Sequence, residues 1–233
     1  MSTSQILPRR SRTYKSNLAD SERWTAYRSR KDDVLISTPP KSGTTWMQTM
    51  CALLLLGWDD FDAQPGVISP WYDMNPVPVE EVNAMLEAQS HRRFIKTLES
   101  ILTHDASFVH FEQLPNIHLF HYQLMREDTE GTIARLASVL GVPMDAAAVA
   151  RVGELSSFEH MQSNAGQFVP SADLGLWKDE SRFFAKARSS AWKSVLSPNA
   201  LAQYRERIEQ IGEQQQISSA QLNWLHQSAE NDL

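Results

Sequence analysis

The side chains best suited to chemistry lie together in residues 37–46, whose sequence is STPPKSGTTW. The apolar run 34–36 precedes them, and residues of good helix propensity follow as far as Gly57, which suits a left-handed helix end. Because two prolines forbid continuation of the strand, the order buried strand, loop, helix is predicted. Such a loop directs N–H groups outward at the positive end of a helix dipole, which predicts an anion site.

Phosphate is the anion that suits this loop best. Lys41 adds a positive charge, and Gly43 lets the backbone approach an oxygen closely. Hydroxyl donors are supplied by Ser42, Thr44 and Thr45. Trp46 offers a flat face on which a base can stack. The lysine precedes the glycine turn, which distinguishes the loop from the Walker pattern. The alternative is an ordinary strand-to-helix turn with Trp46 packed in the core.

The string PPKSGTTW after a strand resembles the 5′-phosphosulfate loop of the cytosolic-type sulfotransferases. The resemblance implies that residues 41–46 bind the 5′-phosphosulfate end of 3′-phosphoadenosine 5′-phosphosulfate (PAPS), with Trp46 on the adenine. It also implies an α/β, P-loop-like three-layer fold, in which helices flank a central, mainly parallel sheet. We expect one domain over residues 1–233, with an N-terminal extension at 1–30 and a long, breaker-rich loop at 58–78.

A second family segment follows a predicted helix at 79–88. Residues 92–97, RRFIKT, resemble a strand that ends in RRFIKTH, where the lysine contacts the sulfuryl group and the histidine is the catalytic base. Lys96 matches the lysine, whereas Leu98 occupies the histidine's place. His104 is the nearest histidine and therefore the candidate replacement base.

The chain then departs from the family pattern. The resemblance implies a further core strand, with an arginine and a serine that bind the 3′-phosphate, but the sequence passes directly to residues 114–122, LPNIHLFHY, which resemble a later strand. A block of several elements is therefore missing, by internal deletion or by loss of a piece of a longer protein. The sheet should be correspondingly shorter.

The family pattern resumes in the second half of the chain. An amphipathic helix is predicted at 126–140 and a final helix from Ser197 to Gly212. Between them, the resemblance places three residues around the adenine: Ser156, Phe158 and Met161. The segment 183–193 resembles FFRKGxxGxWK, but alanine replaces its arginine. Lys186 keeps the lysine that can reach a 3′-phosphate, and Arg188 either substitutes for the lost arginine or is a solvated loop charge.

The composition of the chain limits which binding partners and which cellular compartment are expected. The net charge of −6 argues against a nucleic-acid surface, and the longest apolar run, residues 50–56, is too short to span a membrane. Residues 1–12 lack the apolar core of a signal peptide, so a cytoplasmic protein is expected. The single cysteine, Cys51, is interpreted as a core residue. No metal is expected, because His118 and His121 would lie on opposite faces of a predicted strand at 114–122.

The resemblance implies transfer of a sulfuryl group from PAPS to a hydroxyl or amine of a small-molecule acceptor, with Lys41 and Lys96 stabilising charge. Aromatic residues in the 58–78 loop either indicate an apolar alcohol or phenol as acceptor or only anchor the loop. Two alternatives stay open. The chain is a remnant that binds a nucleotide or phosphate without turnover, or it folds only with a partner, for example as a homo-oligomer.

Overall fold

A computed structural model describes residues 13–39, 41–57, 64–97, 114–169, 183–184, 195–215, 217–222 and 224. The chain divides into two compact units. The first unit comprises Met1–Asp105 and Thr129–Ala185, and the second comprises Ala106–Asp128 and Lys186–Leu233. The expectation of a single domain over 1–233 stays a prediction.

Among the described residues, two parallel strands form the sheet of the first unit. Strand β1 (Val34–Ser37) pairs with β2 (Phe94–Thr97) in a register that sets Val34 opposite Phe94 and Ser37 opposite Thr97. Because the strands are parallel, their carboxyl ends meet at one edge of the sheet. That edge carries the loop after β1, as the sequence predicts, and the end of β2.

Within the described part of the sheet, β2 has neighbours on both sides and β1 on one. On the side of β2 away from β1, Lys96 N donates to Pro70 O (3.1 Å) and Tyr72 N donates to Lys96 O (3.0 Å). Every residue of β2 is buried, whereas Leu35 in β1 is 47% exposed. The prediction of a fully buried β1 is therefore wrong. Among the described residues β1 pairs with β2 alone, so one side of the strand lacks the neighbour that would bury it.

The crossover from β1 to β2 contains three helices, α1 (Thr44–Leu56), α2 (Pro65–Ile68) and α3 (Val79–Ala88). Helix α1 contacts both strands and is buried along most of its length. Gly57 ends α1 at a φ of 83°, and α3 has the predicted bounds. The 58–78 loop is more regular than expected, since it contains α2 and the bridge from Trp71 to Lys96. Its residues 58–63 lie outside the described part.

The N-terminal extension docks on the first unit through aromatic side chains. A 3₁₀ helix, η1 (Ser21–Ala26), carries Trp24, whose ring centroid lies 4.6 Å from that of Tyr72. Tyr27 packs edge-on against the same ring at 5.1 Å. Together with Val82 and Leu86 of α3, these side chains form one apolar cluster on Tyr72. The extension from residue 13 onward is therefore part of the core.

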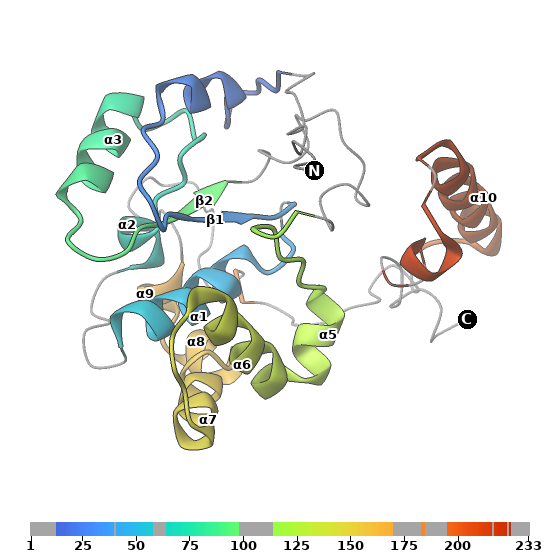
Figure 1. The fold of residues 1–233 in the computed structure, drawn as a ribbon. Coiled ribbons are helices and arrows are strands. Elements are labelled where there is room, and N and C mark those ends of the chain that lie inside the picture. Colours follow the sequence, from blue (N-terminus) through green and yellow to red (C-terminus); the bar gives the residue numbers. More distant parts are fainter. Residues whose placement is uncertain are drawn as a thin grey trace, which may run out of the picture. The chain divides into compact units, whose positions relative to one another are not determined.

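Four further helices are described in the first unit: α6 (Thr129–Leu140), α7 (Ala146–Leu155), α8 (Phe158–Ser163) and α9 (Ala165–Phe168). They lie with α1 on one side of the strands, and η1 and α3 lie on the other (Figure 1). Asp145 and Ser157 cap α7 and α8 with side-chain oxygens. The helix predicted at 126–140 begins at Thr129, because Asp128 adopts a non-helical conformation.

The second unit contains α5 (Tyr122–Glu127) and α10 (Pro198–Gln215). Ser197 caps α10 as predicted, by accepting from Ala200 N (3.2 Å), but the helix continues past Gly212. The strand predicted at 114–122 is wrong. Residues 117–121 are irregular and α5 begins at Tyr122, because a β-rich segment forms a strand only where a neighbour can pair with it. In the described part of the chain, no helix has the length and apolarity needed to cross a membrane.

Candidate active site

The loop between β1 and α1 has the geometry of an anion site. Lys41 and Gly43 both adopt left-handed conformations, with φ of 64° and 89°. Gly43 is the N-cap of α1 and has no side chain with which to occupy the N–H groups of the first turn. Thr38 and Thr44 hydrogen-bond through their hydroxyls and so tie the loop to the helix start. The left-handed lysine is the kind of backbone strain that accumulates at functional sites.

Two lysines from different segments meet at this edge. The side chain of Lys41 is exposed, with its Nζ 4.4 Å from the centroid of the Phe183 ring. Lys96 comes from β2, is 8% exposed, and places its Nζ 4.5 Å from the centroid of the Trp71 ring. Both ammonium groups therefore rest on aromatic faces, which are favourable neighbours for a cation.

The pKa of Lys96 is lowered to about 8, well below the ordinary lysine value, chiefly because burial disfavours the charged ammonium group. The positive charge of Lys41 acts in the same direction. The carboxylate of Asp73 acts in the opposite direction. An anion between the two lysines would relieve their repulsion, so the structure has a place where a dianionic group is electrostatically favoured.

The predicted adenine segment lies at the junction of α7 and α8. Ser156 is fully buried, and in the described part of the structure its Oγ has no hydrogen-bond partner. Phe158 is half-buried, and Met161 is 3% exposed. An orphaned buried hydroxyl is costly, so its presence here fits a group that a ligand completes.

Phe183 and Phe184 contact both the loop after β1 and the predicted adenine segment. The ring of Phe184 meets that of Phe158 edge-on at 6.1 Å, and Gln162 Nε2 donates to Phe184 O (2.8 Å). Phe183 in turn lies under Lys41. The structure therefore brings together three segments that the sequence singled out separately. Trp46, in the first turn of α1, is half-buried.

Sequence reasoning missed Asp73. This carboxylate is 1% exposed, and its Oδ2 accepts from Thr97 Oγ1 (2.7 Å), next to Lys96 on β2. Burial raises its pKa, while Thr97 and the indoles of Trp71 and Trp24 act to lower it. No spacing marks Asp73 in the sequence, because its role depends on the bridge that sets its segment beside β2.

Three predicted residues, His104, Lys186 and Arg188, lie outside the described residues. Among those described, no group of three or more His, Cys, Asp or Glu side chains gathers as it would around a metal ion. Cys51 is buried in α1, and burial raises its thiol pKa to about 12, in agreement with a core role.

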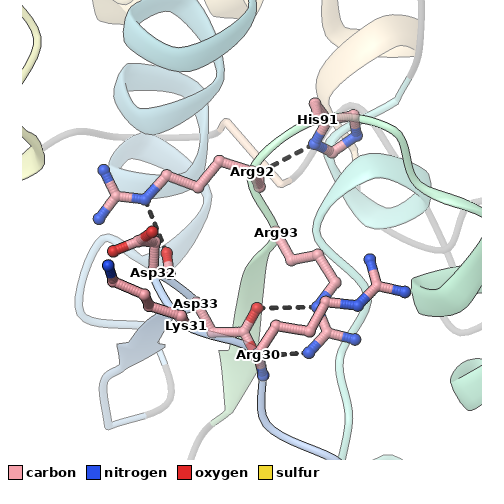
Figure 2. A pocket seen from close by; sticks show the side chains of 7 residues that line it. All are labelled: Arg30, Lys31, Asp32, Asp33, His91, Arg92 and Arg93. Atoms are coloured by element: carbon pink, nitrogen blue, oxygen red, sulfur yellow. Dashed lines mark hydrogen bonds and ion pairs between the residues drawn. The ribbon is translucent and has the colours of Figure 1, made fainter.

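A separate pocket of about 290 Å³ opens where β1 and β2 begin, at the end of the strands away from the two lysines. Figure 2 shows two of its basic side chains, Arg92 and Arg93, already engaged. Arg93 makes a two-bond ion pair with Asp33, Nε to Oδ1 at 2.8 Å and Nη2 to Oδ2 at 2.5 Å. Arg92 donates to the carbonyl oxygens of Asp32 and Leu140. These contacts stabilise the strand starts.

The fold defines an α/β protein of the P-loop-like class, with two lysines and the uncapped start of α1 at the carboxyl edge of a parallel sheet. The chain belongs to the sulfotransferase family, because the family model of the sulfotransferase domain matches residues 31–106 and 97–220. The two matches overlap at residues 97–106. The family model therefore aligns to this chain in two pieces, and its pattern is interrupted there.

The curated relatives agree with this assignment. A glycolipid sulfotransferase of Mycobacterium bovis is 25% identical over 295 residues, covering 85% of this chain and 90% of the relative. A glycolipid sulfotransferase of Mycobacterium tuberculosis matches at the same identity and coverage. The alignment is longer than this chain of 233 residues, so the relatives contain residues with no counterpart here. That excess agrees with the predicted missing block.

Solved structures show the same fold. Mouse sulfotransferase SULT7A1, complexed with PAP, superposes with a TM-score of 0.65 at 16% identity, covering 88% of this chain and 91% of the mouse chain. Retinol dehydratase, in complex with androsterone and the inactive cofactor PAP, gives a TM-score of 0.62 at 17% identity, with coverage of 82% and 85%.

Proposed function

We propose that this chain binds PAPS at residues 41–46 and transfers its sulfuryl group to a hydroxyl or amine of a small-molecule acceptor. The observation that carries the proposal is that Lys41 and Lys96, from different segments, both lie at the carboxyl edge of the sheet beside the uncapped start of α1. When bound, PAPS supplies an activated sulfuryl group, and its nucleotide part provides groups by which the protein can bind it. The residues present fit such a group, since they combine two cations, hydroxyl donors and a glycine at the helix start.

Each part of the chain has a proposed task. Lys41 and the first turn of α1 hold the anionic end, and Lys96 stabilises charge that develops on the transferred group. The adenine is assigned to Trp46, Phe158, Met161 and Ser156, and the 3′-phosphate to Lys186 and Arg188. His104 is the proposed proton acceptor, since Leu98 cannot take that role.

The acceptor is proposed to be an apolar alcohol or phenol. Trp71, from the segment beside β2, brings aromatic surface next to Lys96. The relatives named glycolipid sulfotransferases and the neighbour bound to androsterone support an acceptor of this class. A cytoplasmic location and a homo-oligomeric state are likewise proposals.

Calorimetric titration with PAP, the desulfonated product, tests the cofactor site. We expect micromolar binding, and at least a tenfold loss in Lys41→Ala, because one charge-assisted contact contributes about 1.5–3 kcal/mol. Lys31→Ala is the matched control, since Lys31 is an exposed lysine at the opposite end of β1. Equal affinity in both variants would contradict the assignment of the loop.

An assay of sulfuryl transfer distinguishes an enzyme from a remnant that only binds the nucleotide. If wild type binds PAP but transfers no sulfuryl group from PAPS to any of a panel of hydroxyl and amine acceptors, the chain is the remnant that the sequence leaves open. If His104→Ala abolishes transfer while PAP binding persists, His104 is the base.

Replacing Ser156 with alanine should affect the free and the bound protein in opposite ways. Removing a buried hydroxyl that has no partner among the described residues should raise the free energy of unfolding by up to about 1 kcal/mol. The same change should weaken PAP binding severalfold, because the ligand loses its partner. Chemical denaturation and calorimetry measure the two effects. Loss of stability with unchanged affinity would assign Ser156 a purely structural role.

A further inference from the structure

The ring of Trp71 lies against a charged group that the protein buries. Lys96 is 8% exposed, and its Nζ lies 4.5 Å from the centroid of the Trp71 ring. Among the described residues, the Lys96 ammonium group forms no ion pair. A buried charge needs a compensating neighbour, and the electron-rich face of an indole is the aromatic surface that attracts a cation most strongly. Trp71 therefore offers Lys96 a favourable contact in the free protein.

The backbone of the segment beside β2 sets this contact. Lys96 N donates to Pro70 O (3.1 Å), and Tyr72 N donates to Lys96 O (3.0 Å). These two bonds make a parallel bridge in which Trp71 lies opposite Lys96. Tyr72 and Ile95 pack with α3 on one face of the sheet. Alternation along both segments then places the side chains of Trp71 and Lys96 on the opposite face, where α1 lies (Figure 1).

The other lysine of the proposed site makes a contact of the same kind in a different setting. Lys41 Nζ lies 4.4 Å from the centroid of the Phe183 ring, but Lys41 is exposed. Cation–π attraction is weaker where water solvates the cation, and phenylalanine is a poorer partner than tryptophan. The contact between Trp71 and Lys96 is therefore the one with the larger effect on a lysine.

We propose that Trp71 is a positioning residue, whose indole face holds the ammonium group of Lys96 in place and favours its charged form before an anion binds. This inference rests on the proposed function, because Lys96 stabilises charge on the transferred group there. A neutral ring attracts the ammonium group without repelling an incoming anion, whereas a carboxylate in the same position would repel it. The ring face that Lys96 covers is closed to an acceptor, so Trp71 also acts on the donor side of the reaction.

The ionisable groups around Lys96 act in different directions. Burial and the positive charge of Lys41 lower the pKa of Lys96, which is about 8, and the charge of Asp73 acts to raise it. Strand β1 carries no ionisable residue, and Cys51, the ionisable residue of α1, stays neutral because burial raises its pKa to about 12. A weaker ring at position 71 should lower the pKa of Lys96 further, because the ring favours the charged form.

Fluorination of the Trp71 ring tests the proposal almost without changing the shape of the side chain. Tryptophan carrying one, two or three fluorine atoms is introduced at position 71 by stop-codon suppression. The ¹³Cε resonance of Lys96, assigned with Lys96→Arg, gives the pKa of the lysine in the free protein. Fluorine withdraws electron density from the ring face, so this pKa should fall stepwise, by about one pH unit over the series. An unchanged pKa would mean that the ring only fills space, and the proposal would be wrong.

Phe183 provides the matched control. Fluorinated phenylalanine at position 183 weakens the ring under Lys41 and leaves the ring beside Lys96 intact. The pKa of Lys96 should therefore stay the same in this series. Equal shifts in both series would show that the fluorine atoms act at a distance, which would overturn the assignment of the effect to the contact with Trp71.

Calorimetric titration with PAP separates this inference from the proposed function. An anion binds the protonated lysine more tightly, so PAP affinity should fall as the pH rises through about 8, and at pH 8 the trifluorinated protein should bind roughly fivefold more weakly than wild type. PAP binding together with a pKa that ignores fluorination would overturn the inference alone. A stepwise pKa in a folded protein that binds no PAP at any pH would instead overturn the proposed function.

Discussion

Replacing Arg93 with methionine is expected to lower the free energy of unfolding by about 3–5 kcal/mol. The Arg93 side chain is 2% exposed and its partner Asp33 is 8% exposed, so the substitution leaves a buried carboxylate without its counter-ion. Arg93 also donates to Arg28 O (2.9 Å), which fixes the chain before β1. Urea denaturation followed by tryptophan fluorescence measures the loss.

Arg30→Met is the matched control. Arg30 also forms an ion pair, with Glu87, but the side chains are 40% and 53% exposed, so at most about 1 kcal/mol should be lost. A comparable loss in both variants would mean that burial does not set the strength of the Arg93 pair.

The destabilisation by Arg93→Met should also depend on pH. Burial alone would raise the pKa of Asp33, but hydrogen bonds from Arg93 and other donors hold it below its usual value. A carboxyl with a lowered pKa contributes stability above the pKa of the unfolded chain, and this contribution disappears as the pH falls through the folded pKa. The difference between wild type and variant should therefore shrink in acid.

The second large effect is expected at Gly43. With a φ of 89° at the start of α1, Gly43→Ala should cost about 1–2 kcal/mol of stability. In the proposed site, an added Cβ would keep an anion from approaching the first turn closely, so PAP affinity should fall on the order of a hundredfold, as two contacts of about 1–2 kcal/mol each are lost. Calorimetry and denaturation on the same preparation separate the two effects.

Gly57→Ala tests whether the loss of binding at Gly43 is local. Gly57 also has a positive φ, 83°, at the other end of the same helix, and a Cβ there meets nothing within 4 Å. Its combination of φ and ψ is essentially restricted to glycine, so the stability cost should be at least as large. Retained PAP affinity in Gly57→Ala would show that strain alone does not disable the site, and a parallel loss of affinity would contradict the local interpretation.

The sequence alone determined the strand, loop and helix around residues 37–57, because prolines, glycines and helix formers are local signals that tertiary contacts here reinforce. The same applies to α3 and to the Ser197 cap of α10. The family also followed from the sequence, whereas the binding roles of the loop lysine and Lys96 stay predictions. Each of these inferences depends on residues adjacent along the chain.

The tertiary structure decided what depends on pairing between distant segments. Leu35 is exposed because β1 has one described neighbour, and residues 114–121 are irregular although their composition favours a strand. Asp73 contacts Thr97 because residues 70–72 bridge to β2, and Phe183, distant along the chain, lies under Lys41. Local propensity cannot determine such contacts, because burial and charge at each position are set by side chains many residues away.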